Sequence, residues 1–161
     1  MQLDQKTAQL LVYLVKNKTR CSVTSLMKLV YLVDLISLKK LGHKVSDFEY
    51  KRYNFGPFSE KIYNYLEKLN VEQEIIKTDF DYAFDGSEYV IYKFNKERED
   101  FEFGEISEDE FKIIDNLLED LGGLGAKELT QIAYKTKPMQ KLGATLGGSE
   151  AMGQVLDLAA A

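Results

Sequence analysis

The sequence predicts a mainly helical α+β fold in a single domain: a helical bundle around a buried central helix, with a winged-helix-like β-hairpin. Apolar residues recur every three or four positions in the segments 3–16, 22–42, 58–69 and 107–121, which is the helical period. Residues 80–84 alternate with a period of two and residues 89–94 are rich in β-forming types, which indicates strands. The length of 161 residues, with 45% hydrophobic and 29% charged residues, suits one globular domain.

The first two helices have clear ends. Asp4 can cap a helix over 3–16, and Ser22 can cap a second helix that closes with Lys39, Lys40 and Gly42. The second segment carries two apolar stripes and few polar positions, so we expect it to be the central helix of the core. Lys28 and Asp34 are the exceptions within it.

A short aromatic and basic strand is predicted over about 49–55, before a Gly-Pro pair. Gly56 lets the chain turn sharply, and Pro57 fits the first turn of a helix because its missing N–H is not needed there. We therefore expect a third helix from Pro57 onwards, with Gly56 and Pro57 in structural roles.

The second half begins with a hairpin. Asp85-Gly86 is a tight-turn dipeptide between two β-forming runs. Ser107 and Glu110 form a capping-box pattern that starts a fourth helix, ended by two glycines, and a shorter helix is expected over about 126–134. We expect the domain to span 1–140, and 141–161 to be a Gly-rich tail packed on it.

Charge is distributed unevenly along the chain. The net charge of −5 divides into +6 for residues 1–70, −12 for 71–124 and +1 for 125–161. Such asymmetry favours either an interaction surface or mutual attraction of the two parts within one fold.

Several functional classes have little support in the composition. One His and one Cys cannot form a His/Cys zinc site, and Cys21 has no partner for an intramolecular disulfide. No apolar run approaches the roughly 18 residues of a membrane span, and the N-terminus lacks the pattern of a signal peptide. We therefore expect a cytoplasmic protein that does not contact a membrane, with no catalytic residue, no metal ligand and no cofactor.

Two binding surfaces compete as interpretations. Tyrosines supply rigid contact area for a protein partner, and the acidic segment 97–110 could attract a cationic one. The candidate partner-contact residues are Tyr31, Asp34, Tyr50, Tyr53, Glu99, Asp100 and Glu102. The alternative is a winged-helix-like DNA-binding regulator that uses Lys39, Lys40, Lys51 and Arg52.

The acidic hairpin makes nucleic acid the weaker alternative, since Asp79, Asp81, Asp85 and Glu88 would repel phosphate. An enzyme ranks third, and a deep pocket lined by Tyr31, Asp34 and Tyr53 would favour it. A homodimer is a further possibility.

A family resemblance rests on three ordered pieces of the chain. They are Lys28-Leu29-Val30-Tyr31-Leu32-Val33-Asp34, then Gly42 and Tyr50, then Tyr53-Asn54-Phe55-Gly56-Pro57-Phe58-Ser59-Glu60. This pattern resembles the Panacea domain, or SocA-like antitoxin domain. The C-terminal part of many members carries Leu-Thr, then Thr-His and Pro-Trp. Here Leu129-Thr130 is present, but 134–139 reads Tyr-Lys-Thr-Lys-Pro-Met, which indicates a divergent branch.

The resemblance implies a mainly helical domain of toxin–antitoxin and phage-associated operons that acts by protein contact. Members are described as antitoxins, and at least one type as an adaptor that presents a toxin to a protease. The leading hypothesis is therefore a non-catalytic interaction module whose partner is a cognate toxin.

Overall fold

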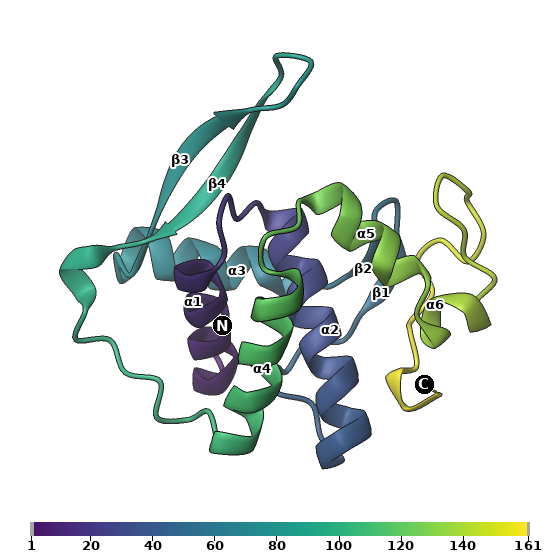
Figure 1. Cartoon of the computed structure of the whole chain (residues 1–161), viewed down its shortest axis with the longest axis horizontal. Coiled ribbons are helices and arrows are strands. Elements are labelled where there is room, and N and C mark those ends of the chain that lie inside the picture. Colours follow the sequence, from purple (N-terminus) through teal and green to yellow (C-terminus); the bar gives the residue numbers. More distant parts are fainter. Residues whose placement is uncertain (1, 161) are drawn as a thin grey trace.

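A computed structural model describes residues 2–160 and has the predicted mainly helical α+β class (Figure 1). Helix α2 (Val23–Leu41) is its centre: it packs against α1 (Gln5–Asn17), α4 (Glu108–Leu121) and α5 (Ala126–Tyr134). Most of its side chains are buried, which follows from its two apolar stripes.

The helix ends lie close to their predicted places. Asp4 caps α1 through the N–H of Thr7, and Ser22 forms a capping box with Ser25 at the start of α2. Gly42 ends α2 with a φ of +83°, a conformation that glycine adopts without strain. Ser107 and Glu110 form the predicted capping box of α4.

The helix predicted to begin at Pro57 begins instead at Lys61, and the prediction was wrong in this detail. Gly56 has a φ of +98°, which turns the chain back so that β2 (Gly56–Phe58) pairs antiparallel with β1 (Lys51–Tyr53). Pro57 lies within this two-stranded sheet, where a missing N–H is tolerated at an edge.

Helix α3 (Lys61–Glu67) follows and continues into a π-helical turn, η1 (Lys68–Glu72). The predicted second hairpin is present as β3 (Ile76–Tyr82) and β4 (Glu88–Phe94), paired from Ile76 with Phe94 to Tyr82 with Glu88. Its base packs on α1 and α2, and its far end projects away from the helices (Figure 1). A short 3-10 turn, η2 (Lys96–Arg98), begins the connector to α4.

The C-terminal part follows the helical body closely. Beyond α5, the sequence reading missed a short helix, α6 (Lys137–Lys141), which has Pro138 in its first turn. Turns then lead to a final 3-10 turn, η3 (Leu158–Ala160). Backbone hydrogen bonds join this segment to β1: Arg52 N–H donates to Gln154 at 2.9 Å, and Leu156 N–H donates to Tyr50 at 2.8 Å.

Candidate functional site

A buried carboxylate on α2 organises the loop that leads to β1. Oδ1 of Asp34 accepts the backbone N–H groups of Val45 and Ser46 at 2.8 and 2.9 Å. Oδ2 accepts the hydroxyls of Ser46 and Tyr50, the latter at 2.6 Å. Burial raises the pKa of Asp34, and these hydrogen bonds act in the opposite direction. The arrangement satisfies the carboxylate fully, so Asp34 holds the loop in place.

Three of the candidate partner-contact residues belong to this core network. Tyr31, Asp34 and Tyr50 have at most 1% of their surface exposed. Tyr31 and Tyr50 contact each other edge to face, and the Tyr31 hydroxyl lies 2.7 Å from Thr136 Oγ1. A partner could touch these side chains only if they left the core, so in this structure they support the surface and do not form it.

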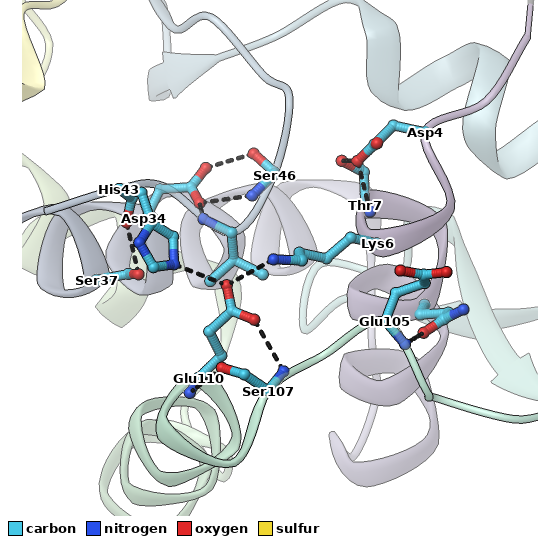
Figure 2. Close-up of polar contacts among 12 residues, drawn as sticks. Asp4, Lys6, Thr7, Asp34, Ser37, His43, Ser46, Glu105, Ser107 and Glu110 are labelled. Atoms are coloured by element: carbon cyan, nitrogen blue, oxygen red, sulfur yellow. Dashed lines mark hydrogen bonds and ion pairs between the residues drawn. The ribbon is translucent and has the colours of Figure 1, made fainter. Parts of the chain in front are cut away.

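A second polar cluster joins the start of α4 to α1 and to the loop after α2 (Figure 2). Lys6 Nζ and His43 Nε2 each lie 3.1 Å from Glu110 Oε2, and Figure 2 shows them converging on it from two sides. Ser107 N–H donates to Glu110 Oε1 at 2.9 Å. Burial would raise the pKa of Glu110, but hydrogen bonds from Ser107 and Lys6 outweigh it, and the pKa lies below its ordinary value.

The acidic connector between the hairpin and α4 lies along α1. Its aromatic residues face inward, with Phe103 packed edge to face on Tyr13 at 5.3 Å. The carboxylates Glu99, Asp100 and Glu102 are exposed, as a partner contact requires. Glu99 also pairs with Lys16 at 3.5 Å. Three ion pairs thus link the basic part of the chain to the acidic part. They are Lys16–Glu99, Lys6–Glu110, and Arg20–Asp81 at 2.8 Å.

The four basic residues named for nucleic-acid binding separate in the structure. Lys39 and Lys40 are exposed at the end of α2, and Lys51 is exposed on β1. Arg52 is completely buried, and its Nη2 donates to the carbonyls of Thr145 and Gly148 at 3.0 and 2.8 Å. Arg52 therefore binds the C-terminal segment and is not available to phosphate.

The turn between β1 and β2 forms one wall of a surface pocket of about 790 Å³. The start of α2 and the start of α3 form its other sides, and Tyr53, half-buried, is the one candidate partner-contact tyrosine that lines it. Lys28 also lines the pocket, although it is 1% exposed, and its Nζ donates to the Pro57 carbonyl at 3.0 Å. Burial lowers the pKa of Lys28 to about 7.

The far end of the β3–β4 hairpin exposes several large apolar side chains. Phe80 and Tyr82 alternate along β3, Val90 is paired opposite Phe80, and Phe84 lies in the turn. All four side chains are exposed, and Phe84 is entirely so. Sequence reasoning recognised the hairpin but treated it only as a possible wing, because alternation alone does not show whether a strand face is covered.

The class of protein follows from a match to a known family. The family model described as antitoxin SocA-like, Panacea domain, matches residues 26–138. The chain belongs to this family. Searches of curated proteins and of solved structures found no significant match. Membership suggests a role related to toxin–antitoxin systems.

The C-terminal residues that match the family pattern, and Tyr134, which departs from it, have packing roles in this Panacea domain. Leu129 and Thr130 are buried on α5. The Tyr134 hydroxyl donates to the Asn54 carbonyl at 3.2 Å, and the Arg52 guanidinium lies over the Tyr134 ring at 5.2 Å. Tyr134 thus holds the β1–β2 turn against α5.

Within residues 2–160, no helix is both long and apolar enough to cross a membrane. The same part of the chain contains no cluster of three or more His, Cys, Asp or Glu side chains placed to hold a metal ion. Cys21 is buried, and burial raises the pKa of its thiol to about 12.

Proposed function

We propose that this chain is a non-catalytic protein-interaction module of the antitoxin type, which binds a cognate toxin and either neutralises it or presents it to another protein. The observation that carries the proposal is that the hairpin β3–β4 projects from the helices (Figure 1) and exposes aromatic side chains. We further propose that the module acts in the cytoplasm, where its toxin partner would be made.

The hairpin has the chemistry of a protein-contact surface. Phe80, Tyr82 and Phe84 are each more than half exposed, at 58%, 63% and 111%. Exposure of aromatic side chains to water is unfavourable, and their burial by a partner lowers the free energy of the complex. Such side chains often contribute most of the binding energy of protein interfaces. Their position at the end of a hairpin allows insertion into a concave surface of the partner.

The charge of the hairpin favours a basic partner. The hairpin, residues 76–94, contains four carboxylates and two lysines, Lys77 and Lys93, which gives it a net charge of −2. On the face away from the aromatic stripe, Asp79 pairs with Lys93 at 3.1 Å and Asp81 pairs with Arg20 at 2.8 Å. Asp85 and Glu88 are exposed near the turn. This sign of charge steers a cationic protein towards the hairpin and opposes approach of a nucleic-acid backbone.

The acidic connector supports the same partner chemistry. Glu99, Asp100 and Glu102 are exposed on the chain that leaves the base of the hairpin. We assign them a role in the rate of association, because rim charges act mainly through steering. Tyr53 lines the pocket by β1, and we do not include it in this surface.

Co-expression with the product of the adjacent gene tests the proposal. The triple variant Phe80→Ser, Tyr82→Ser, Phe84→Ser removes the aromatic stripe without touching the core. We expect the wild-type chain to restore growth of cells that express the neighbouring toxin, and the triple variant to lose at least tenfold in colony number.

Leu146→Ser is the matched control, because Leu146 is also exposed, at 51%, and lies in the C-terminal segment. It should protect as well as the wild type. Equal protection by the triple variant and the wild type would remove the hairpin from the interface. A neighbouring gene that is harmless when expressed alone would contradict the antitoxin function itself.

A further inference from the structure

The pocket beside β1 and β2 combines a buried amine with aromatic walls. Lys28 lies one helical turn after Thr24 on α2, and both side chains line the pocket. Phe58 makes an edge-to-face contact with Tyr53 at 5.7 Å and a tilted contact with Tyr63 at 5.6 Å, so these rings form a continuous wall. Phe55, which is 63% exposed, completes the lining at the turn.

Within the part of the chain that the structure describes, the amine of Lys28 has no carboxylate partner. It donates a hydrogen bond to the neutral carbonyl of Pro57, and within residues 2–160 it forms no ion pair. An ammonium group has three donors, so two remain for other acceptors. A buried cation without a carboxylate weakens the fold unless something else supplies the negative charge.

The other charges of the lining are already engaged. Lys61 pairs with Asp47 at 3.6 Å, and Glu60 accepts the Tyr53 hydroxyl at 3.2 Å. The pocket also lies beside the N-terminal turn of α2, where the helix dipole favours negative charge. The lining therefore places the Lys28 amine beside the start of α2 and the Glu60 carboxylate beside Tyr53, and its open wall is aromatic.

We propose that this pocket binds a small organic anion, a carboxylate or phosphate carried on a flat apolar body, with Lys28 contacting the anionic group and the aromatic wall contacting the body. A volume of about 790 Å³ is within the range of pockets that hold small ligands. This assignment is independent of the toxin interaction, which involves the distant hairpin.

The lowered pKa of Lys28 agrees with this role. With a pKa of about 7, the amine is only partly charged near neutral pH. An anion placed against it favours the protonated form, so the ligand would supply the counter-charge that the chain lacks.

Titrations of the full chain with three related probes test the proposal by NMR chemical-shift mapping. Phenyl phosphate and phenylacetate carry the two anions, and benzyl alcohol is the neutral analogue. We expect both anions, or one of them, to bind at least tenfold more tightly than benzyl alcohol, with the largest shifts at Asn54, Phe55 and Gly56. Tighter binding of phenyl phosphate would indicate a phosphate site, and tighter binding of phenylacetate would indicate a carboxylate site.

Two variants separate the roles of amine and wall. Lys28→Met keeps the side-chain length without the charge and should remove the preference for anions, whereas Tyr63→Ser should weaken all three probes. Lys39→Met, at an exposed position away from the pocket, should leave the affinities unchanged. Equal affinity of the wild type for charged and neutral probes would overturn the proposal, as would shifts that map elsewhere.

A measurement on the unmodified protein makes the test independent of the folding of the variants. Trinitrobenzenesulfonate labels uncharged lysine amines, and mass spectrometry locates the label. We expect phenyl phosphate to slow the labelling of Lys28 at least fivefold and to leave that of Lys39 unchanged. Labelling of Lys28 that is unaffected by saturating phenyl phosphate and phenylacetate would contradict an anion at this amine.

Discussion

Three polar residues that look like surface residues in the sequence are almost completely buried: Lys28, Asp34 and Arg52. The partners that compensate for the loss of water differ among the three. Asp34 receives four hydrogen bonds, and Arg52 donates to main-chain carbonyls of the C-terminal segment. Lys28 donates to the Pro57 carbonyl and lines an open pocket. This difference is the reason for assigning ligand binding to Lys28 and structural roles to the other two.

Lys28 predicts a particular pH dependence of stability. Its pKa is about 7 in the folded protein and near 10.5 in the unfolded chain, so between these values the unfolded chain binds more protons. The free energy of unfolding should therefore rise with pH above 7, by at most about 1.4 kcal/mol per unit. Lys18, whose pKa is also lowered by burial, adds to this slope. Above about pH 9 the raised pKa of the Cys21 thiol acts in the opposite direction and offsets the contribution of Lys28.

Urea denaturation of wild type and Lys28→Met at pH 7, 8 and 9 measures the effect. The variant should be at least as stable as the wild type at pH 7, because it no longer buries an unpaired amine, and its slope should be shallower. Lys39→Met should keep the wild-type slope. Identical slopes for Lys28→Met and wild type would show that the Lys28 amine is not buried in solution.

At the scale of elements, short-range sequence patterns predicted the helices well but predicted the junctions between elements less well. The capping residues Asp4, Ser22 and Ser107 mark helix starts because their side chains bond to N–H groups two or three residues away. The junction at Gly56-Pro57 was misread. Its conformation depends on Lys28 and Tyr134, which are distant in sequence and contact the turn only in the folded chain.

The loop between α2 and β1 depends on Asp34, and this predicts a large loss of stability. Asp34→Ala removes the acceptor for two buried N–H groups and two hydroxyls, so we expect about 3–5 kcal/mol less free energy of unfolding. Tyr50→Phe removes one of these bonds and should cost about 1 kcal/mol. Chemical denaturation compares the two. A loss below 1 kcal/mol for Asp34→Ala would mean that the loop is held by other contacts.

At the scale of the whole molecule, the basic and acidic parts of the chain partly neutralise each other. Lys6–Glu110, Lys16–Glu99 and Arg20–Asp81 are ion pairs between them. Carboxylates beyond these pairs remain exposed on the hairpin and the connector. Some carboxylates of this chain are therefore paired with its own basic residues, and only the unpaired ones on the surface are available to a partner.

The C-terminal segment is tied to the body through Arg52, which predicts the effect of its removal. Arg52→Ala leaves the carbonyls of Thr145 and Gly148 without their donor and should lower the free energy of unfolding by about 2–4 kcal/mol. It should also speed tryptic cleavage at Lys141, next to the loosened segment. Lys51→Ala, an exposed neighbour on β1, is the control. Unchanged cleavage in Arg52→Ala would show that other contacts hold the segment.

The sequence by itself determined the fold class, most helix boundaries, the projecting hairpin and the family resemblance, because periodicity and capping act over a few residues. Only the tertiary structure decided which polar residues are buried and which aromatic residues are exposed. In the structure, four residues expected at a binding surface are buried in the core: Tyr31, Asp34, Tyr50 and Arg52. Three aromatic residues are exposed instead: Phe80, Tyr82 and Phe84. Burial depends on which elements cover a side chain, and that follows from contacts between segments far apart in the chain.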